Sequence, residues 1–135
     1  MHNGRLDVLV LNAAASTHIG TQLEISERRY DRMWEVNVKS VFFHIKECYP
    51  MLKKSKAEGG AANVLVISSM GGQNPHSFMG VYCMTKAALD NMVKSLSVEL
   101  MPDGIRINSL PSGLIDTTFA SWILKSNSVA KNAIG

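Results

Sequence analysis

"NVLVIS", residues 63–68, is a short aliphatic run in which apolar residues barely alternate with polar ones. Such a run is typical of a strand that is buried on both faces of a parallel sheet. Two further segments, "LDVLVLNAAA" at 6–15 and "GIRINSL" at 104–110, are likewise aliphatic or β-branched and are bounded by turn residues. We therefore expect three strands that belong to one parallel sheet.

Two long helical patterns lie between the expected strands. The first runs from about Ser26, a suitable N-cap, to about Lys54, with Pro50 close to its end and two glycines beyond. The second runs from about Gly80 to Met101, and the turn residues 102–104 follow it. This alternation predicts an α/β fold, a βαβαβ unit with right-handed crossovers in a single domain over residues 1–135.

This topology leaves one face of the sheet without cover. Right-handed crossovers between strands laid down in order place every helix on the same face. The opposite apolar face and the unpaired first strand are then exposed, which natural domains avoid because such surfaces aggregate. We therefore expect the chain of 135 residues to be a fragment of a larger sheet.

The composition indicates a globular intracellular protein and argues against several classes of partner. The chain has 46% hydrophobic and 19% charged residues, a formal net charge of +3 and a pI near 9.0, without a long run of Lys and Arg. We expect no nucleic-acid partner, and no apolar stretch is long enough to span a membrane. Histidines and cysteines show no metal-ligand spacing, so no metal is expected, and Cys48 and Cys83 suit a reducing compartment. A cytoplasmic location is the default, while a peroxisomal or mitochondrial one stays open.

The residues that follow the three strands are expected to meet. In a parallel α/β sheet, ligands bind beyond the carboxyl ends of the strands. Those positions hold Asn-Ala-Ala at 12–14, Ser-Ser-Met-Gly-Gly at 68–72, and Pro-Ser-Gly-Leu-Ile-Asp-Thr at 111–117. Small and hydroxylated residues there allow a ligand to approach the backbone closely.

Tyr82 and Lys86 lie one helical turn apart at the start of the second helix. A free tyrosine has a pKa of about 10, and a neighbouring ammonium favours the phenolate. The pair therefore predicts a tyrosine of lowered pKa that acts as a general acid or base, with Ser69 holding a substrate carbonyl beside it. Taken alone, each feature has an ordinary alternative, since such a pair is usually surface decoration and a Ser-Ser pair is usually a turn or a helix cap.

The complete set of segments resembles the short-chain dehydrogenase/reductase family from about Gly4 to Ser121. "GRLDVLVLNAA" is similar to the family's central strand with its Asn-Asn-Ala-Gly element, and "VNVKSVFF" to the helix with the catalytic asparagine. "NVLVISSMGG" and "YCMTK" are similar to the Ser strand and the Tyr-x-x-x-Lys helix, and "GIRINSLPSGLIDT" to the strand and Pro-Gly loop that hold the nicotinamide. The resemblance implies a partial Rossmann-type parallel sheet, three strands with crossover helices, lacking the N-terminal dinucleotide-binding half and the C-terminal end.

The resemblance also implies a catalytic tetrad of Asn37, Ser69, Tyr82 and Lys86 in an NAD(P)-dependent oxidoreductase. Hydride would move between the nicotinamide and a carbonyl or alcohol substrate. Tyr82 would pass the proton, Lys86 would lower its pKa and hold the nicotinamide ribose, and Ser69 would orient the substrate oxygen. Asn37 would hold a water of the proton relay through a local distortion of its helix.

Cofactor contacts are implied both for Tyr82 and Lys86 and for the strand ends. The strand-end residues are Asn12, Ala13, Ser112, Gly113, Ile115 and Thr117. Asn12 would line the cleft near the adenosine half, and Ile115 and Thr117 would contact the carboxamide end. NAD or NADP is the expected cofactor, with NADP favoured.

Three departures from the family pattern matter. Residues 11–14 read Leu-Asn-Ala-Ala, which is similar to some carbonyl reductases of the member-4 type. Ser112-Gly113 stands where the family has Pro-Gly, with Pro111 one place early. No Gly-rich pyrophosphate-binding turn precedes the first strand, so we expect residues 1–135 alone not to turn over.

Two other hypotheses stay open: a non-catalytic truncated form that associates with full-length subunits, and an incomplete gene product. Apolar stripes on the two long helices would carry such association, and the resemblance implies homo-oligomers formed through them in the intact protein. The substrate is expected to be a small carbonyl or alcohol compound, with identity and reaction direction open. The segments expected to line its site are 15–20, 71–80 and 118–126, with Met70, Phe78 and Trp122 among the contacts.

Overall fold

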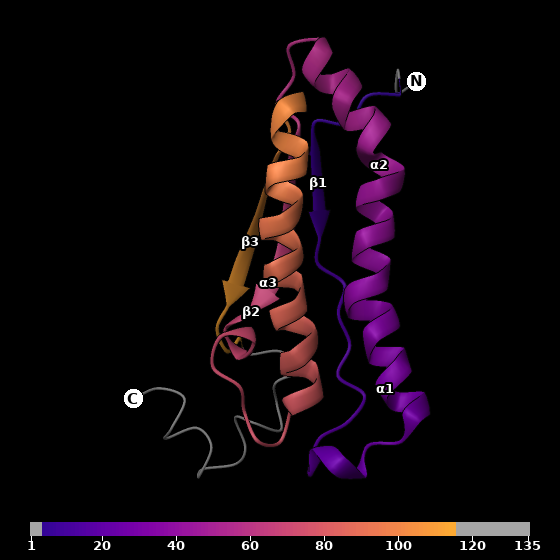
Figure 1. The fold of residues 1–135 in the computed structure, drawn as a ribbon, viewed down its shortest axis with the longest axis vertical. Coiled ribbons are helices and arrows are strands. Elements are labelled where there is room, and N and C mark those ends of the chain that lie inside the picture. The colour runs from indigo at the N-terminus through magenta and orange to yellow at the C-terminus, as the bar shows by residue number, and fades with distance from the viewer. Residues whose placement is uncertain (1–3, 116–135) are drawn as a thin grey trace.

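The computed structural model describes residues 4–115 and confirms the three-stranded parallel sheet (Figure 1). Its strands, in the spatial order β1-β2-β3, are β1 (Val8–Leu11), β2 (Asn63–Ser69) and β3 (Arg106–Ser112). Asn63, the first residue of β2, pairs with Val8 of β1 on one side and with Arg106 of β3 on the other. Because all three strands run in one direction, their carboxyl ends point to the same edge of the sheet.

Two long helical segments connect the strands, as expected. In the first, α1 (Glu27–Trp34) continues through a π-helical turn, η2 (Glu35–Lys39), into α2 (Ser40–Ala57). The second is α3 (Gly80–Leu100). Three short 3-10 turns complete the described elements: η1 (Gln22–Glu24), η3 (Met70–Gly72) and η4 (Met101–Asp103).

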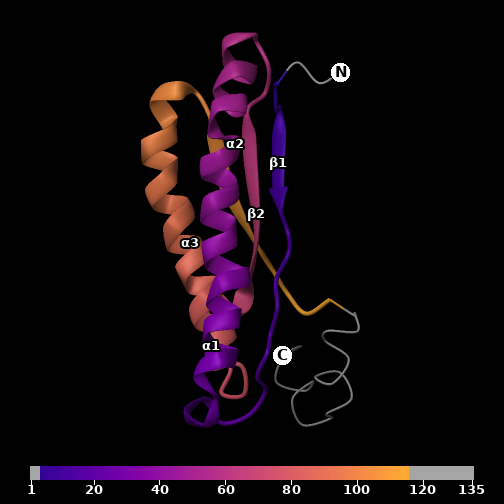
Figure 2. The same cartoon turned by 90° about the vertical axis from the view of Figure 1, so that its right-hand side faces the viewer.

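Both long helical segments lie on one face of the sheet (Figure 2). The opposite face carries apolar side chains without cover from any described residue. Val8, Val10 and Leu110 on that face are 51%, 54% and 54% exposed. The expectation of a one-sided sheet is therefore confirmed for residues 4–115.

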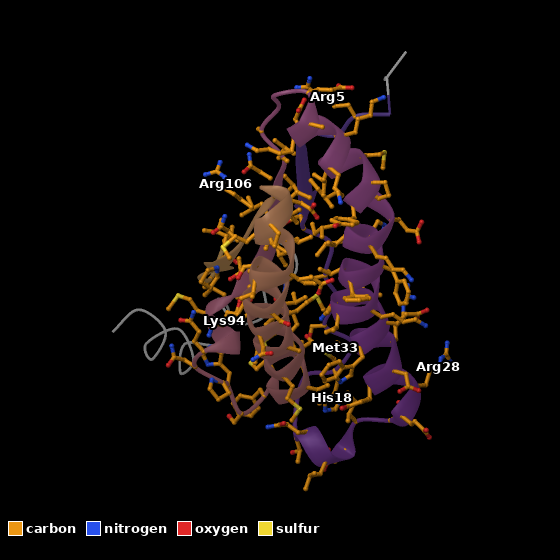
Figure 3. All side chains as sticks on the ribbon, turned by 45° about the horizontal axis from the view of Figure 1, so that its top comes forward. Arg5, His18, Arg28, Met33, Lys94 and Arg106 are labelled. Carbon is orange, nitrogen blue, oxygen red and sulfur yellow. The ribbon has the colours of Figure 1, made fainter. Side chains whose placement is uncertain are left out.

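The hydrophobic core fills the space between the sheet and the helices. Alternate residues of β2 are buried, so Val64 and Val66 face the helices while their neighbours face the open side. Figure 3 shows Met33, which is fully buried, on the inner side of α1, whereas Arg28 and Lys94 point outward. The other main core residues are Val41, Ile45, Leu52, Ala62, Leu89, Val93, Leu100, Ile105 and Ile107.

Some element boundaries differ from the prediction. β1 covers only part of the expected segment 6–15, and α2 contains Pro50, as expected, but ends at Ala57 instead of at about Lys54. β3 extends through Pro111 and Ser112, which were expected in the following loop. A proline fits there because β3 is an edge of the described sheet, where one side of the strand needs no N–H donor.

The described part of the chain contains no helix long and apolar enough to cross a membrane. Within it, no group of three or more His, Cys, Asp or Glu side chains is placed to hold a metal ion. Cys48 and Cys83 are both free thiols.

Candidate active site

The ends of β2 and β3 meet at the carboxyl edge of the sheet. Ser69 and Ser112 are the last residues of their strands and pair with each other. Ser112 Oγ also donates a hydrogen bond of 3.2 Å to the Ser68 carbonyl. Asn12 and Ala13, both exposed, leave β1 at the same edge. The three strand ends therefore frame one site, as the sequence predicts.

Ser69 and Tyr82 lie side by side. The Ser69 hydroxyl acts on the pKa of the Tyr82 phenol, and Ser69 Oγ accepts a hydrogen bond of 3.1 Å from the Gly71 N–H. This arrangement depends on Gly72, because a Cβ there would lie 2.9 Å from backbone atoms of both Lys86 and Ala87. The missing side chain lets η3 lie directly on α3, so the end of β2 reaches the first turn of the helix.

Lys86 is buried in the same site, with only 2% of its surface exposed. Its Nζ donates a hydrogen bond of 2.8 Å to the Ile67 carbonyl and lies 5.6 Å from the centroid of the Tyr82 ring. Burial lowers the pKa of Lys86 to about 8, and the carboxylate of Asp90 opposes that shift. The amine thus sits near the phenol at a pKa well below the usual value for lysine.

The pKa of Tyr82 moves in the direction opposite to the one expected. Burial raises it above the ordinary value, the hydrogen bond from Ser69 lowers it, and Cys83 adds a smaller upward contribution. Lys86 Nζ lies over the ring and donates its hydrogen bond to the Ile67 carbonyl, and the effect of burial prevails for Tyr82. In this arrangement Tyr82 is a protonated phenol at neutral pH.

Asn37 lies in the π-helical turn η2 and is fully buried. Its Oδ1 accepts from the Ala15 N–H at 2.8 Å, and its Nδ2 donates to the Ala15 carbonyl at 2.9 Å and to Thr85 Oγ1 at 3.0 Å. The expected helix distortion at Asn37 is therefore present. Its amide side chain joins the segment after β1 to α3, rather than pointing into open space.

With this geometry established, comparison with known proteins decides the family. Residues 1–134 match a family model described as enoyl-(acyl carrier protein) reductase. A dehydrogenase/reductase SDR family member 4 from Sus scrofa is 36% identical over 92% of this chain and 44% of that protein. The short-chain dehydrogenase/reductase SDRA of Arabidopsis thaliana is 36% identical over 93% and 46%, respectively.

The chain belongs to the short-chain dehydrogenase/reductase family. A short-chain type dehydrogenase/reductase from Mycobacterium ulcerans superimposes with a TM-score of 0.85 at 28% identity, covering 96% of this chain and 46% of that one. A 3-ketoacyl-(acyl-carrier-protein) reductase from Brucella melitensis, complexed with NADH, gives 0.83 at 27% identity, covering 87% and 49%. The chain spans about half the length of the relatives it matches.

The remaining predicted site residues lie at the end of β3 and just beyond it. Ser112 is partly buried, while Gly113 and Ile115 are exposed beyond β3. The buried Lys86 ammonium at this edge has hydrogen-bond donors of the kind that bind the hydroxyl groups of a dinucleotide ribose. Thr117 and Trp122 lie outside the described residues.

Two residues of the site carry no sequence signal that we recognised. Thr85 is fully buried, and its Oγ1 donates 2.7 Å to the Tyr82 carbonyl while accepting from Asn37. Ser68, on the buried face of β2, contacts the Lys86 carbonyl at 3.3 Å. Ser68 lies in the Ser-Ser pair and Thr85 in the Tyr-x-x-x-Lys segment, and these positions were the signal that could have identified them.

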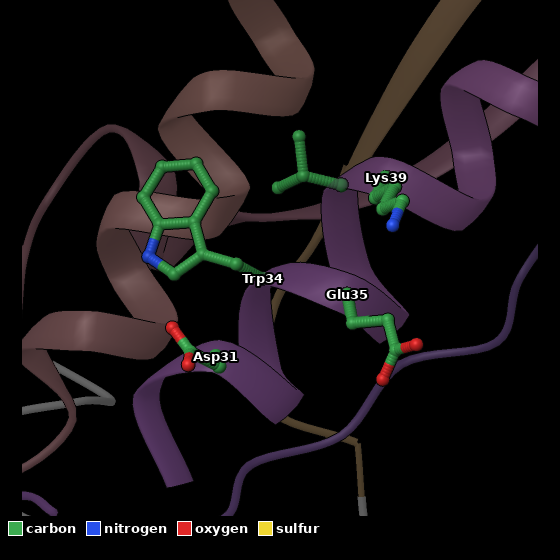
Figure 4. A pocket seen from close by; sticks show the side chains of 5 residues that line it. Asp31, Trp34, Glu35 and Lys39 are labelled. Carbon is green, nitrogen blue, oxygen red and sulfur yellow. The ribbon is translucent and has the colours of Figure 1, made fainter. Parts of the chain in front are cut away.

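A hollow of about 320 Å³ lies beside α1 and η2 (Figure 4). In Figure 4, Asp31 and Trp34 lie to one side of this hollow and Glu35 and Lys39 to the other. None of the tetrad side chains lines it. We therefore treat it as a feature of the helix surface and not as part of the candidate active site.

Proposed function

We propose that the protein takes part in nicotinamide-dependent hydride transfer between the cofactor and a small carbonyl or alcohol compound. The observation that carries this proposal is the position of the Ser69 hydroxyl beside the Tyr82 phenol, with the Lys86 amine 5.6 Å from the centroid of the phenol ring. In the proposal, Tyr82 is the proton donor and Ser69 is the hydroxyl that orients the substrate oxygen. The family supplies the reaction class.

In this proposal Tyr82 donates its hydroxyl proton to the substrate oxygen, and Ser69 holds that oxygen by a hydrogen bond. Burial favours the neutral phenol, which is the form that donates a proton when a carbonyl is reduced. Lys86 places a positive charge near the phenol and binds the ribose hydroxyls of the cofactor. Asn37 fixes the segment after β1 against α3, and we assign the relay water to the backbone around its π-helical turn.

The cofactor would supply the hydride. Tyr82 and Lys86 would hold its ribose, while the strand-end residues would hold its two ends: Asn12, Ala13, Ser112, Gly113, Ile115 and Thr117. The Brucella relative binds NADH, and we propose NADP as the first cofactor to test for this chain. The sequence of 135 residues includes no Gly-rich strand-to-helix turn, so we propose that it depends on a further unit for the pyrophosphate.

The substrate side of the site is apolar as well as polar. Met70 and Phe78 are each 51% exposed, and both lie in the segment between β2 and α3 that carries Ser69 toward Tyr82. Exposed apolar side chains next to a hydroxyl pair favour a carbonyl attached to a hydrocarbon group. Aliphatic and aromatic ketones and aldehydes are therefore the compounds to assay first.

Tyr82→Phe tests the proposed chemistry. We expect this variant to reduce carbonyl turnover by roughly 10²–10⁴-fold in the longest in-frame product that contains residues 1–135, assayed with NADPH and NADH. Tyr30→Phe removes a hydroxyl from the surface of α1 and serves as the matched control. Unchanged turnover in Tyr82→Phe would rule out the proposed proton donor. Saturable cofactor-dependent turnover by residues 1–135 alone would rule out the dependence on a further unit.

A second candidate function, association through the helices, is favoured by a specific surface. Tyr30, Phe42, Phe43 and Met84 on the long helical segments are between 37% and 47% exposed. A groove of about 250 Å³ between α2 and α3 adjoins Phe42. Co-purification with a full-length relative discriminates the two functions, because association survives Tyr82→Phe but is lost in a Phe42→Gln, Phe43→Gln double variant.

A further inference from the structure

Asp90 is an acidic residue with an unusual environment on α3. Both of its carboxylate oxygens are buried, and neither has a hydrogen-bond partner among the described residues. Removing a carboxylate from water without hydrogen bonds is costly unless an opposite charge compensates it. A nearby cation would therefore stabilise the buried carboxylate of Asp90.

Lys86 and Lys94 both lie four residues from Asp90 in α3, and of the two Lys86 is the buried one. It lies four residues before Asp90 in the same helix, so the two side chains share one face of α3. Its buried Nζ donates one hydrogen bond, to the Ile67 carbonyl, and Asp90 is the only charged side chain of the described residues that acts on its protonation. The ring centroid of the titratable phenol of Tyr82 is 5.6 Å from the amine.

Charged groups on the elements packed against α3 do not replace Asp90. The β2 strand has no charged residue, and Cys83 of α3 acts on Tyr82 but not on Lys86. None of the charged residues on the other packed elements contributes to the pKa of Lys86: Glu27, Arg28, Arg29, Asp31 and Arg32 on α1, Glu35 and Lys39 on η2, Asp103 on η4, and Arg106 on β3.

We propose that Asp90 is a positioning residue of the active site, which acts by stabilising the charged form of Lys86 from one helical turn away. This inference rests on the proposed function for one point only, the role of Lys86 in the reaction. The electrostatic link itself belongs to the folded chain, whether or not it turns over. Asp90 needs no contact with substrate or cofactor for this role.

The stabilisation matters because burial already brings the pKa of Lys86 down to about 8. Loss of the Asp90 charge removes an upward contribution, so the pKa of Lys86 falls further. A larger share of molecules then holds a neutral amine at neutral pH. A neutral amine binds ribose hydroxyls and supports proton transfer at Tyr82 less well.

The test is a direct titration of Lys86 in the full chain. Lysine carrying ¹³C at Cε reports protonation by NMR, and Lys86→Arg assigns the resonance. We expect the midpoint near 8 in the wild type to fall in Asp90→Asn and in Asp90→Ser. Glu99→Gln removes the same charge from an exposed position later in α3, and we expect it to leave the midpoint in place.

The outcomes separate this inference from the proposed function. A lower midpoint in either folded neutral variant, restored by Asp90→Glu, supports the inference even if no carbonyl reduction is found. An unchanged midpoint, or an equal fall in Glu99→Gln, overturns it even if turnover is present. In an active product, Asp90→Asn should also shift the pH profile of turnover, which a purely structural role for Asp90 would not do.

Discussion

Thr85 joins two parts of the candidate site through a single hydroxyl group. Its Oγ1 donates to the Tyr82 carbonyl and accepts from Asn37 Nδ2, in a fully buried position. Removing that oxygen would leave a buried amide hydrogen without an acceptor, which costs more than the hydrogen bond itself contributes. One atom therefore ties η2 to α3 beside Tyr82.

Thr85→Val keeps the branched shape and removes the hydroxyl. We expect the free energy of unfolding to fall by about 1–3 kcal/mol, measured by urea unfolding followed by circular dichroism. Thr85→Ser, which retains the oxygen, is the matched control and should lose clearly less. A valine variant as stable as the wild type would show that the hydroxyl does not hold the two elements together.

At the scale of elements, the contact between η3 and α3 sets the distance from Ser69 to Tyr82. Gly72→Ala would place a Cβ 2.9 Å from backbone atoms of Lys86 and Ala87, and helix backbone cannot move aside cheaply. We expect the variant to push η3 outward, to lose about 1–3 kcal/mol of stability by urea unfolding, and to separate Ser69 from Tyr82.

Gly113→Ala is the control for that change in stability. A Cβ at Gly113 would meet only Met70 Sδ, at 3.4 Å, which is the end of a flexible side chain. Its unfolding midpoint should stay close to that of the wild type. If Gly72→Ala and Gly113→Ala unfold at the same urea concentration, the close approach of η3 to α3 is not what requires a glycine.

The elements that local sequence determines were predictable from it, and the others were not. An unbroken aliphatic run predicts β2, and helical spacing of apolar residues predicts α3, because both signals lie within the segment itself. The distortion at Asn37 was predicted through the family resemblance and not from local sequence, because the π-helical turn depends on Ala15, 22 residues away. The extension of β3 through Pro111 was not predicted and depends on pairing with β2. Burial of the Tyr82 phenol likewise follows from tertiary packing, so the direction of its pKa shift could not be predicted from its spacing to Lys86.

At the scale of the whole molecule, the two faces of the sheet differ in cover. The helices shield one face completely enough to bury Val64, Val66 and Ile107, whereas Val8, Val10 and Leu110 on the other face remain about half exposed (Figure 2). These three side chains come from both outer strands, β1 and β3. A contiguous apolar surface of this kind promotes association.

We expect the chain of 135 residues to bind the dye ANS and to self-associate as its concentration rises, because the open sheet face offers apolar area to both. The double variant Val10→Thr, Leu110→Thr should reduce the dye fluorescence and the mass measured by light scattering, since threonine keeps the strand preference while adding a hydroxyl. Val98→Thr is the matched control, because Val98 is 68% exposed but lies on α3, away from the sheet. Equal reductions in the control and in the double variant would show that the open sheet face does not cause the association. The exposed apolar side chains of the helices would then be the surface to test.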